Sequence, residues 1–259
     1  MTQQEYEIGS KGGELKVPVS TNIEYTCSVM EGAKDWISIT NPRTKGLEDY
    51  NIVLQIAENK YDAGRVGQVK ITGAGKESFI TITQGVDEDL LKQRPALMAL
   101  YNALNGDQWI NKNNWGSDKP LSEWYGVSVD GNGFVTRLEL QENNLSGTLP
   151  AEVGDLVKLT ALYLGYNYGI GGSIPAEIGN LKKLEYLNLY GNELTGGIPE
   201  ELYSLPELFH LDLGVNKLSG ELSPKIAGLS KLTSLWLHYN NFSGSLPKEL
   251  GQMNLTQVG

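Results

Sequence analysis

Cysteine, histidine and long apolar runs are the scarcest features of this 259-residue chain. The single cysteine, Cys27, excludes a disulfide within the chain and a multi-cysteine zinc site. We expect Cys27 to be a packed strand residue, because no second cysteine or nearby histidine accompanies it. No run of about 18 apolar residues occurs, so no segment is expected to cross a membrane. The start of the chain lacks the pattern of a signal peptide, so an exported form would carry its leader outside this sequence.

Basic side chains are also few. The chain has 21 lysines and arginines against 31 aspartates and glutamates, a net charge of −10. Every region is acidic: residues 1–86 hold 9 basic and 11 acidic side chains, residues 87–134 hold 4 and 7, and residues 135–259 hold 8 and 13. Nucleic acids and anionic membranes require a basic face, so neither is an expected partner.

Catalytic signatures are missing as well. The sequence contains no H-E-x-x-H, G-x-S-x-G, Walker or dinucleotide-binding motif. The G-x-G at Gly131 and Gly133 lies in a predicted hairpin turn. We therefore predict no catalytic residues, no cofactor and no metal site, and we expect the protein not to be an enzyme.

From Val135 onward the sequence repeats with a unit of about 24 residues. Its core, L-x-x-L-x-L-x-x-N, alternates with the period of a strand that buries one face. One unit cannot bury its leucines alone, so neighbouring units are expected to stack into a solenoid. Five copies and the start of a sixth occupy 135–158, 159–183 (with one extra residue near Gly169), 184–207, 208–231, 232–254 and 255–259.

One asparagine recurs at the same position in every complete repeat. A buried asparagine offers two donors and an acceptor, which suffices for its own turn and for the adjacent coil. We predict a structural ladder, rather than a binding row, formed by Asn143, Asn167, Asn192, Asn216 and Asn240.

The segments LSGTLP, LTGGIP and FSGSLP make residues 135–259 resemble the plant-type leucine-rich repeat. Residues 87–134 resemble the N-terminal cap of that family, with a helix from Asp87 to Gly106 that Pro95 is expected to restart. Plant caps carry C-x-W-x-G-V-x-C here, whereas this chain has Ser122 and Val129 at the cysteine positions. Three tryptophans are expected to cover the open edge of the first repeat: Trp109, Trp115 and Trp124.

Residues 1–86 contain six short β-branched runs, at 14–20, 23–29, 36–40, 50–57, 67–73 and 78–84. This pattern predicts an immunoglobulin-like β-sandwich. Trp36, Asn59, Arg65, Gly67 and the Gln84-Gly85 pair make the segment resemble the BACON domain of Bacteroidetes proteins. The resemblance implies either carbohydrate binding or a spacer role, and Trp36 is expected to anchor the core. The predicted fold is therefore an all-β sandwich followed by an α/β leucine-rich-repeat solenoid with a helical cap.

Aromatic side chains gather on the predicted concave face of the solenoid. They occupy the positions beside the buried leucines, where burial does not account for them, and exposed tyrosine and tryptophan are typical of recognition surfaces. Packing of each ring on its neighbour is the alternative explanation. The predicted ligand-binding residues are Arg137, Glu139, Tyr163, Tyr166, Tyr186, Asn188, Tyr190, His210, Asp212, Trp236, His238 and Tyr239.

These expectations combine into a non-catalytic recognition module, adhesin-like or receptor-like, that binds a protein or peptide. Glycan binding within a polysaccharide-use system and a purely structural scaffold remain the alternatives. The BACON resemblance implies export to the surface of a Bacteroidetes cell. Met253, Leu255 and Val258 leave an apolar edge at the end of the last repeat, which indicates either a trimmed chain or an end-to-end dimer.

Overall fold

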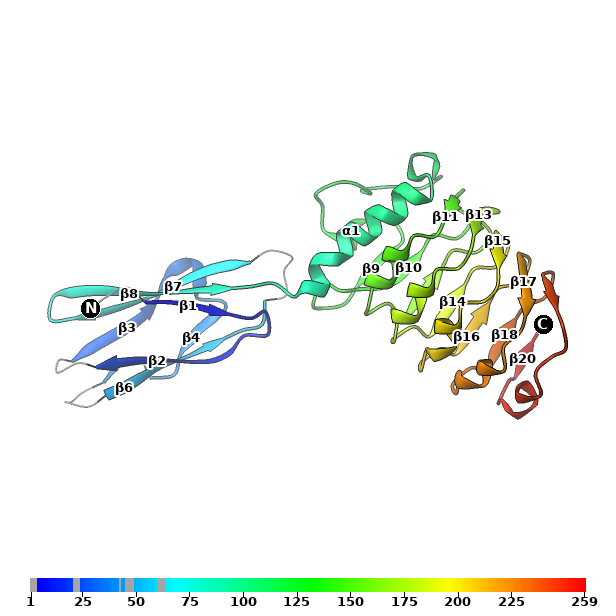
Figure 1. The fold of residues 1–259 in the computed structure, drawn as a ribbon. Helices are drawn as coiled ribbons and strands as arrows, with labels where there is room; N and C mark the ends of the chain where they lie inside the picture. Colours follow the sequence, from blue (N-terminus) through cyan, green and yellow to red (C-terminus); the bar gives the residue numbers. More distant parts are fainter. Residues whose placement is uncertain (1–3, 21–23, 42, 45–48, 60–63) are drawn as a thin grey trace. The chain divides into compact units, whose positions relative to one another are not determined.

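The computed structural model describes the chain except residues 1–3, 21–23, 42, 45–48 and 60–63 (Figure 1). The chain divides into two compact units, residues 1–91 and residues 92–259. Ile23, which belongs to the predicted strand at 23–29, lies outside the described residues. Among the described residues no helix has the length and apolar character needed to span a membrane.

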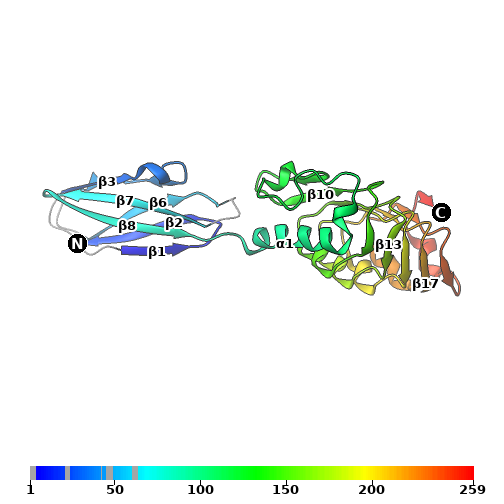
Figure 2. The same cartoon turned by 90° about the horizontal axis from the view of Figure 1, so that it is seen from above.

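The first unit is built from two β-sheets, which Figures 1 and 2 show as separate layers. The five-stranded sheet has the order β1-β8-β7-β3-β5, and the three-stranded sheet has the order β2-β6-β4. The strands are β1 (Gln4–Ile8), β2 (Gly13–Ser20), β3 (Tyr25–Val29), β4 (Ile37–Ile39), β5 (Arg43–Thr44), β6 (Asp49–Ile56), β7 (Arg65–Gly73) and β8 (Lys76–Gln84).

Alternating side chains of both sheets fill one apolar core. In β7 and β8 every second residue is buried, so each strand shows one apolar face and one polar face. Val17 and Ile52 of the smaller sheet share the core with Val69 and Ile80 of the larger one. All six predicted runs form strands. The sequence reading missed β1, whose pairing with β8 is parallel, and the two-residue β5.

The single α-helix of the described residues is α1 (Glu88–Ala103), and its apolar side is part of the solenoid core. Leu97 and Leu100 belong to the same cluster of buried residues as the repeat leucines. One expectation for this segment is wrong: Pro95 lies inside one continuous helix instead of starting a new one. The helix ends at Ala103, before the predicted stop at Gly106, and Asn105 takes the left-handed conformation after it.

The tryptophans follow α1 and stack on one another over the same core. Trp109 and Trp115 meet edge to face at 4.9 Å, and Trp115 lies 5.1 Å from Trp124. Tyr101 of α1 contacts the first two rings. All three tryptophans are buried, as expected of rings that close the apolar end of the repeats. Short 3₁₀ turns flank them: η2 (Gly106–Gln108) and η3 (Leu121–Glu123).

The repeats build a seven-stranded sheet of order β20-β18-β16-β14-β12-β10-β9. All its pairings are parallel except that of β9 with β10, which form a hairpin. Because one repeat supplies one strand, equivalent residues of neighbouring repeats lie side by side. The strands are β9 (Val127–Val129), β10 (Val135–Glu139), β12 (Ala161–Tyr163), β14 (Tyr186–Asn188), β16 (His210–Asp212), β18 (Ser234–Trp236) and β20 (Gln257–Val258).

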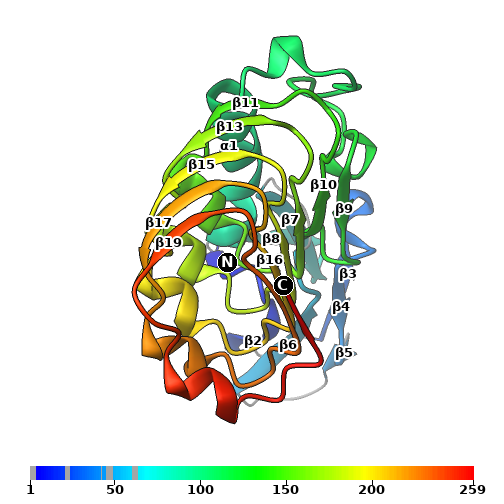
Figure 3. The same cartoon turned by 90° about the vertical axis from the view of Figure 1, so that its right-hand side faces the viewer.

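A second parallel sheet, which the sequence reading did not predict, lies on the other flank of the solenoid (Figure 3). It consists of β11 (Ser146–Thr148), β13 (Gly169–Gly172), β15 (Glu193–Gly196), β17 (Lys217–Glu221) and β19 (Asn241–Ser243). Each repeat then returns through a 3₁₀ turn: η4 (Ala151–Asp155), η5 (Ala176–Asn180), η6 (Glu200–Ser204), η7 (Pro224–Gly228) or η8 (Lys248–Gln252). All residues of the repeats at 135–259 are described, and they contain no α-helix. The prediction of an α/β solenoid is therefore wrong in this respect, because each repeat has a 3₁₀ turn where a helix was expected.

The asparagine ladder is present in the structure. Asn167 donates to the carbonyls of Leu140 and Leu164, and its Oδ1 accepts the N–H of Leu145 in the preceding repeat. Asn216 and Asn240 make the corresponding contacts. These side chains join adjacent turns and point into the solenoid, so they are not available to a ligand.

Candidate functional site

The outer positions of the seven-stranded sheet lie in rows across neighbouring strands. In β14 the central Leu187 is buried, while Tyr186 and Asn188 on either side of it are half-buried and point away from the core. The pairing aligns two rows: Arg137, Ala161, Tyr186, His210 and Ser234 in one, and Glu139, Tyr163, Asn188, Asp212 and Trp236 in the other. We call this surface, together with the residues just after each strand, the aromatic sheet face.

One series of ring contacts crosses the strands of this face. The Arg137 guanidinium lies 5.5 Å from the centre of the Tyr163 ring and binds the Glu139 carboxylate at 2.8 Å. Tyr163 lies 6.3 Å from Tyr186, which in turn lies 6.1 Å from His210. Stacked pairs of this kind hold the rings in place, so little side-chain freedom remains to be lost on binding.

A second series of rings follows the ends of the strands. Tyr166 and Tyr190 lie 4.7 Å apart, and Tyr190 lies 5.9 Å from His238. His238 also contacts Trp236 at 5.9 Å and Tyr239 at 5.3 Å.

Glycine at one position makes this second series continuous. Tyr190 and His238 belong to repeats three and five, and Gly214 stands between them in repeat four. A Cβ at Gly214 would lie 2.7 Å from Cε1 of His238. The absence of a side chain at Gly214 therefore allows the imidazole to lie across the intervening strand and reach Tyr190.

The rings differ in exposure. Tyr166 is 43% exposed and Tyr239 is 81% exposed, whereas the other predicted binding residues are half-buried. The expectation that burial cannot explain these rings is therefore only partly right, because most of them pack on a neighbouring ring. They keep part of their surface open to solvent.

Two exposed rings at this surface were missed from the sequence. Tyr168 is 65% exposed and meets Tyr166 edge to face at 6.3 Å. It lies at the extra residue of the second repeat, where Tyr166 and Tyr168 both have positive φ. The irregular repeat length was the signal that could have identified Tyr168. Phe209, 41% exposed, contacts Tyr186 from the position before β16.

Asp212 and the histidines set the electrostatics of the face. Burial raises the pKa of Asp212, while the Gly214 N–H and the two histidines oppose this shift. Burial also lowers the pKa of His210, and the nearby Asp212 carboxylate opposes this shift. Burial, followed by nearby tyrosines and Asp212, raises the pKa of Tyr190. The Asp212 carboxylate therefore interacts electrostatically with both the His210 imidazole and the Tyr190 hydroxyl.

The two histidines belong to different ring series, because His210 contacts Tyr186 and His238 contacts Tyr190 and Trp236. Within the part of the chain that the structure describes, no three histidine, cysteine, aspartate or glutamate side chains gather as metal ligands would.

Two surface hollows lie near the ends of the solenoid strands. One, of about 560 Å³, is lined by Glu185, Tyr186, Glu207, Phe209 and Lys231, among others. The other, of about 370 Å³, is lined mainly by apolar side chains of the last repeat, including Phe242, Leu246 and Leu250. Leu246 and Val258 are 79% and 64% exposed there. The predicted end-to-end dimer through this edge remains a prediction.

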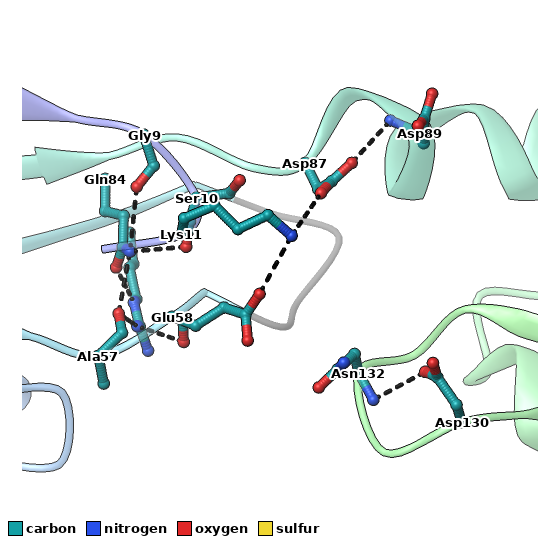
Figure 4. A network of polar contacts seen from close by, with 11 residues as sticks. Gly9, Ser10, Lys11, Ala57, Glu58, Gln84, Asp87, Asp89, Asp130 and Asn132 are labelled. Carbon is teal, nitrogen blue, oxygen red and sulfur yellow. Dashed lines mark hydrogen bonds and ion pairs between the residues drawn. The ribbon is translucent and has the colours of Figure 1, made fainter. Parts of the chain in front are cut away.

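In the first unit, the residues that carry the BACON resemblance form an internal polar network (Figure 4). The Gln84 side chain is fully buried and donates to the carbonyls of Ser10 and Ala57, while its Oε1 accepts from Arg65. Arg65 also lies 4.4 Å from the Trp36 ring centre. At the edge of this network Lys11 pairs with Glu58 at 3.4 Å and with Asp87 at 3.5 Å.

The geometry of this network is that of a structural support. Trp36 is 5% exposed, as expected for a core anchor. A Cβ at Gly67 would lie 2.6 Å from the Trp36 ring, so glycine is required where the strand crosses it. Cys27 is buried, and burial raises its thiol pKa to about 11, which keeps it protonated and unreactive.

Both units of the chain match known protein families. Residues 1–87 match the viral BACON domain family, and residues 173–218 and 231–253 match leucine-rich repeat families. The fold defines the class as a repeat solenoid with a partly exposed aromatic sheet face. The chain belongs to the leucine-rich repeat proteins and carries an N-terminal BACON domain.

Similar proteins include plant receptors. A nodulation receptor kinase of Pisum sativum is 41% identical over 58 residues, which are 21% of this chain and 6% of that protein. The leucine-rich repeat ectodomain of the receptor kinase SOBIR1 from Arabidopsis thaliana is 31% identical, with a TM-score of 0.55 over 66% of this chain and 91% of that one.

The ectodomain of the Arabidopsis thaliana receptor kinase GASSHO1/SCHENGEN3, solved in complex with CASPARIAN STRIP INTEGRITY FACTOR 2, is 28% identical. Its TM-score is 0.60 over 64% of this chain and 21% of that chain. This chain therefore spans about a fifth of that ectodomain and a much smaller part of the nodulation receptor kinase.

Proposed function

We propose that this protein is a non-catalytic recognition module, receptor-like or adhesin-like, that binds a protein or peptide on the aromatic sheet face. The observation that carries the proposal is the continuous series of rings from Tyr166 through Tyr190 and His238 to Tyr239, whose two ends are exposed. Rigid rings contribute a large contact area and lose little conformational entropy on binding.

The similar structures support this class of function. The GASSHO1/SCHENGEN3 ectodomain was solved with a bound factor, and SOBIR1 is a receptor kinase whose solved part is an ectodomain. Because both are ectodomains, we infer that this chain also works outside the cell or at its surface. Adhesin-like display by a Bacteroidetes cell remains a prediction from the BACON resemblance.

The role of the remaining segments follows from their packing. We infer that residues 87–134 form the N-terminal cap of the solenoid, since α1 and the three tryptophans share its core. The two packed sheets of residues 4–84 support an immunoglobulin-like description. The internal use of Trp36, Arg65 and Gln84 favours the spacer role of this domain over the carbohydrate-binding one.

The test is a comparison on arrays of extracellular proteins, peptides and glycans, probed with the wild type and with Trp236→Ala. Trp236 lies on the face and keeps part of its ring exposed, so its removal should leave the repeats folded and weaken binding at least about tenfold. Glu177→Ala, in the exposed part of η5, is the control and should bind as the wild type does. Binding that Trp236→Ala leaves unchanged would contradict the proposal, and binding confined to the glycan array would replace the protein ligand by a sugar.

A further inference from the structure

The centre of the aromatic sheet face is polar. In the row that runs from Tyr163 to Trp236, the two middle strands contribute Asn188 and Asp212 in direct register. Tyr163 thus stands at one end of this polar pair and Trp236 at the other. Neighbouring strands lie about 4.8 Å apart, so these four side chains cover a short segment across the sheet.

Rings also flank the polar pair along the strands. Tyr186 and His210 lie two residues before Asn188 and Asp212, and they contact each other at 6.1 Å. Tyr190 and His238 lie beyond the strand ends and contact each other at 5.9 Å. We call the surrounding rings the aromatic frame: Tyr163, Tyr186, Tyr190, His210, Trp236 and His238.

The frame surrounds a carboxylate that lacks a cationic partner. Asp212 is half-buried, and its Oδ1 accepts the N–H of Gly214 at 3.0 Å. Among the described residues no lysine or arginine pairs with Asp212, and the nearest guanidinium in the rows, that of Arg137, is bound to Glu139. Burial lowers the pKa of His210, which disfavours a charged imidazolium beside this carboxylate.

We propose that Asp212 and the aromatic frame receive a basic side chain, arginine or lysine, of the bound peptide or protein. This inference rests on the proposed function and names the chemical group recognised. A carboxylate gives a cation a charged hydrogen-bond partner, and ring faces attract the same cation through their quadrupoles. The net charge of −10 attracts a basic segment over a longer range.

Asp212→Asn is a conservative substitution because an asparagine, Asn188, already occupies the equivalent position in the preceding repeat. Asn188 holds the same position one repeat earlier, and its Oδ1 accepts the N–H of Tyr190 at 3.1 Å, as Asp212 does with Gly214. The variant therefore removes the charge and keeps the local hydrogen bond. Glu185→Gln is the matched control, because Glu185 is an exposed carboxylate one residue before β14 and lies outside the frame.

The probes are acetylated and amidated pentapeptides, Gly-Gly-X-Gly-Gly, in which X is arginine, lysine or citrulline. Citrulline keeps the shape of arginine and lacks its charge. Binding to the full chain is followed by NMR through the indole N–H of Trp236 and the ring protons of His238. The arginine and lysine peptides should shift these signals and bind at least about tenfold more tightly than the citrulline peptide.

Asp212→Asn should abolish this preference, and Glu185→Gln should retain it. The proposal is overturned if citrulline binds as well as arginine, if Asp212→Asn keeps the preference, or if arginine peptide at about 10 mM shifts no signal of the frame. Failure of this proposal on basic side chains can be distinguished from failure of the proposed function. Ligands found on the arrays that lose binding with Trp236→Ala and not with Asp212→Asn would leave the face as a binding surface without cation recognition.

Discussion

At the scale of single residues, the extra residue of the second repeat breaks the asparagine ladder at one point. Asn216 donates to Leu189 and Leu213, and its Oδ1 accepts the N–H of Leu194. Asn192 makes the same kind of donor contacts, yet its buried Oδ1 has no hydrogen-bond partner. We attribute this difference to the preceding repeat, whose extra residue accompanies positive φ angles at Tyr166 and Tyr168.

The two asparagines should therefore differ in their contribution to stability. Asn216→Ala leaves the buried N–H of Leu194 without this acceptor, whereas Asn192→Ala removes an oxygen that is already unpaired. We expect Asn216→Ala to lower the free energy of unfolding by about 1 kcal/mol more than Asn192→Ala does. Urea unfolding of the full chain measures the difference. Equal losses, or a larger loss for Asn192→Ala, would show that the ladder is not interrupted at Asn192.

Residue-level reasoning from sequence identified the ladder and missed this interruption. The asparagine column is visible because the repeat places it at a fixed position. Whether each side chain finds its partner depends on backbone geometry in the adjacent repeat, which one inserted residue alters. The contact of Tyr190 with His238 is equally hidden, because it depends on the missing side chain at Gly214, in the repeat between these two residues.

At the scale of elements, strand β7 shows how one glycine allows a strand to pack closely against the core. Gly67 lies where β7 passes the ring of Trp36, and a Cβ there would also lie 2.7 Å from the Cβ of Ala33. The two sheets of the first unit share the core that Trp36 fills. The close approach of β7 to this ring is therefore part of how the core closes.

We expect Gly67→Ala to destabilise the first unit by about 1–3 kcal/mol, because the added methyl overpacks a buried site. Hydrogen exchange of the full chain, read on peptides from β7 and β8, reports this unit separately. Gly32→Ala is the control, since a Cβ at Gly32 meets nothing within 4 Å. Unchanged protection in Gly67→Ala, or an equal effect of Gly32→Ala, would contradict the packing described here.

Element prediction succeeded where the apolar pattern was strong. The leucine-based strands and the β-branched runs of the first unit were found. The strands of the second solenoid sheet were missed, because segments such as Gly169–Gly172 carry no alternating pattern and owe their conformation to the neighbouring repeat. The helix break expected at Pro95 does not occur. Its missing N–H leaves the carbonyl of Leu91 without a helical partner, and Leu91 is 47% exposed, so water is available to it.

At the scale of the whole molecule, the chain forms two units with separate cores. The first uses its distinctive polar residues to hold its own backbone, and the second presents rings on an open sheet. Sequence periodicity was enough to predict the solenoid and most residues of the aromatic sheet face, although Tyr168 and Phe209 were missed. It was not enough to predict their exposure, because exposure depends on which rings pack on one another across repeats.

The most direct measurement is oxidative footprinting of the full chain, free and bound to a ligand selected on the arrays. In the free protein the exposed rings of Tyr166 and Tyr239 should be oxidised, as should that of Tyr125, which is 37% exposed and lies outside the face. With ligand bound, Tyr166 and Tyr239 should become protected while Tyr125 stays reactive. Protection of Tyr125 or Leu246, with Tyr166 and Tyr239 still oxidised, would place the binding surface elsewhere on the molecule.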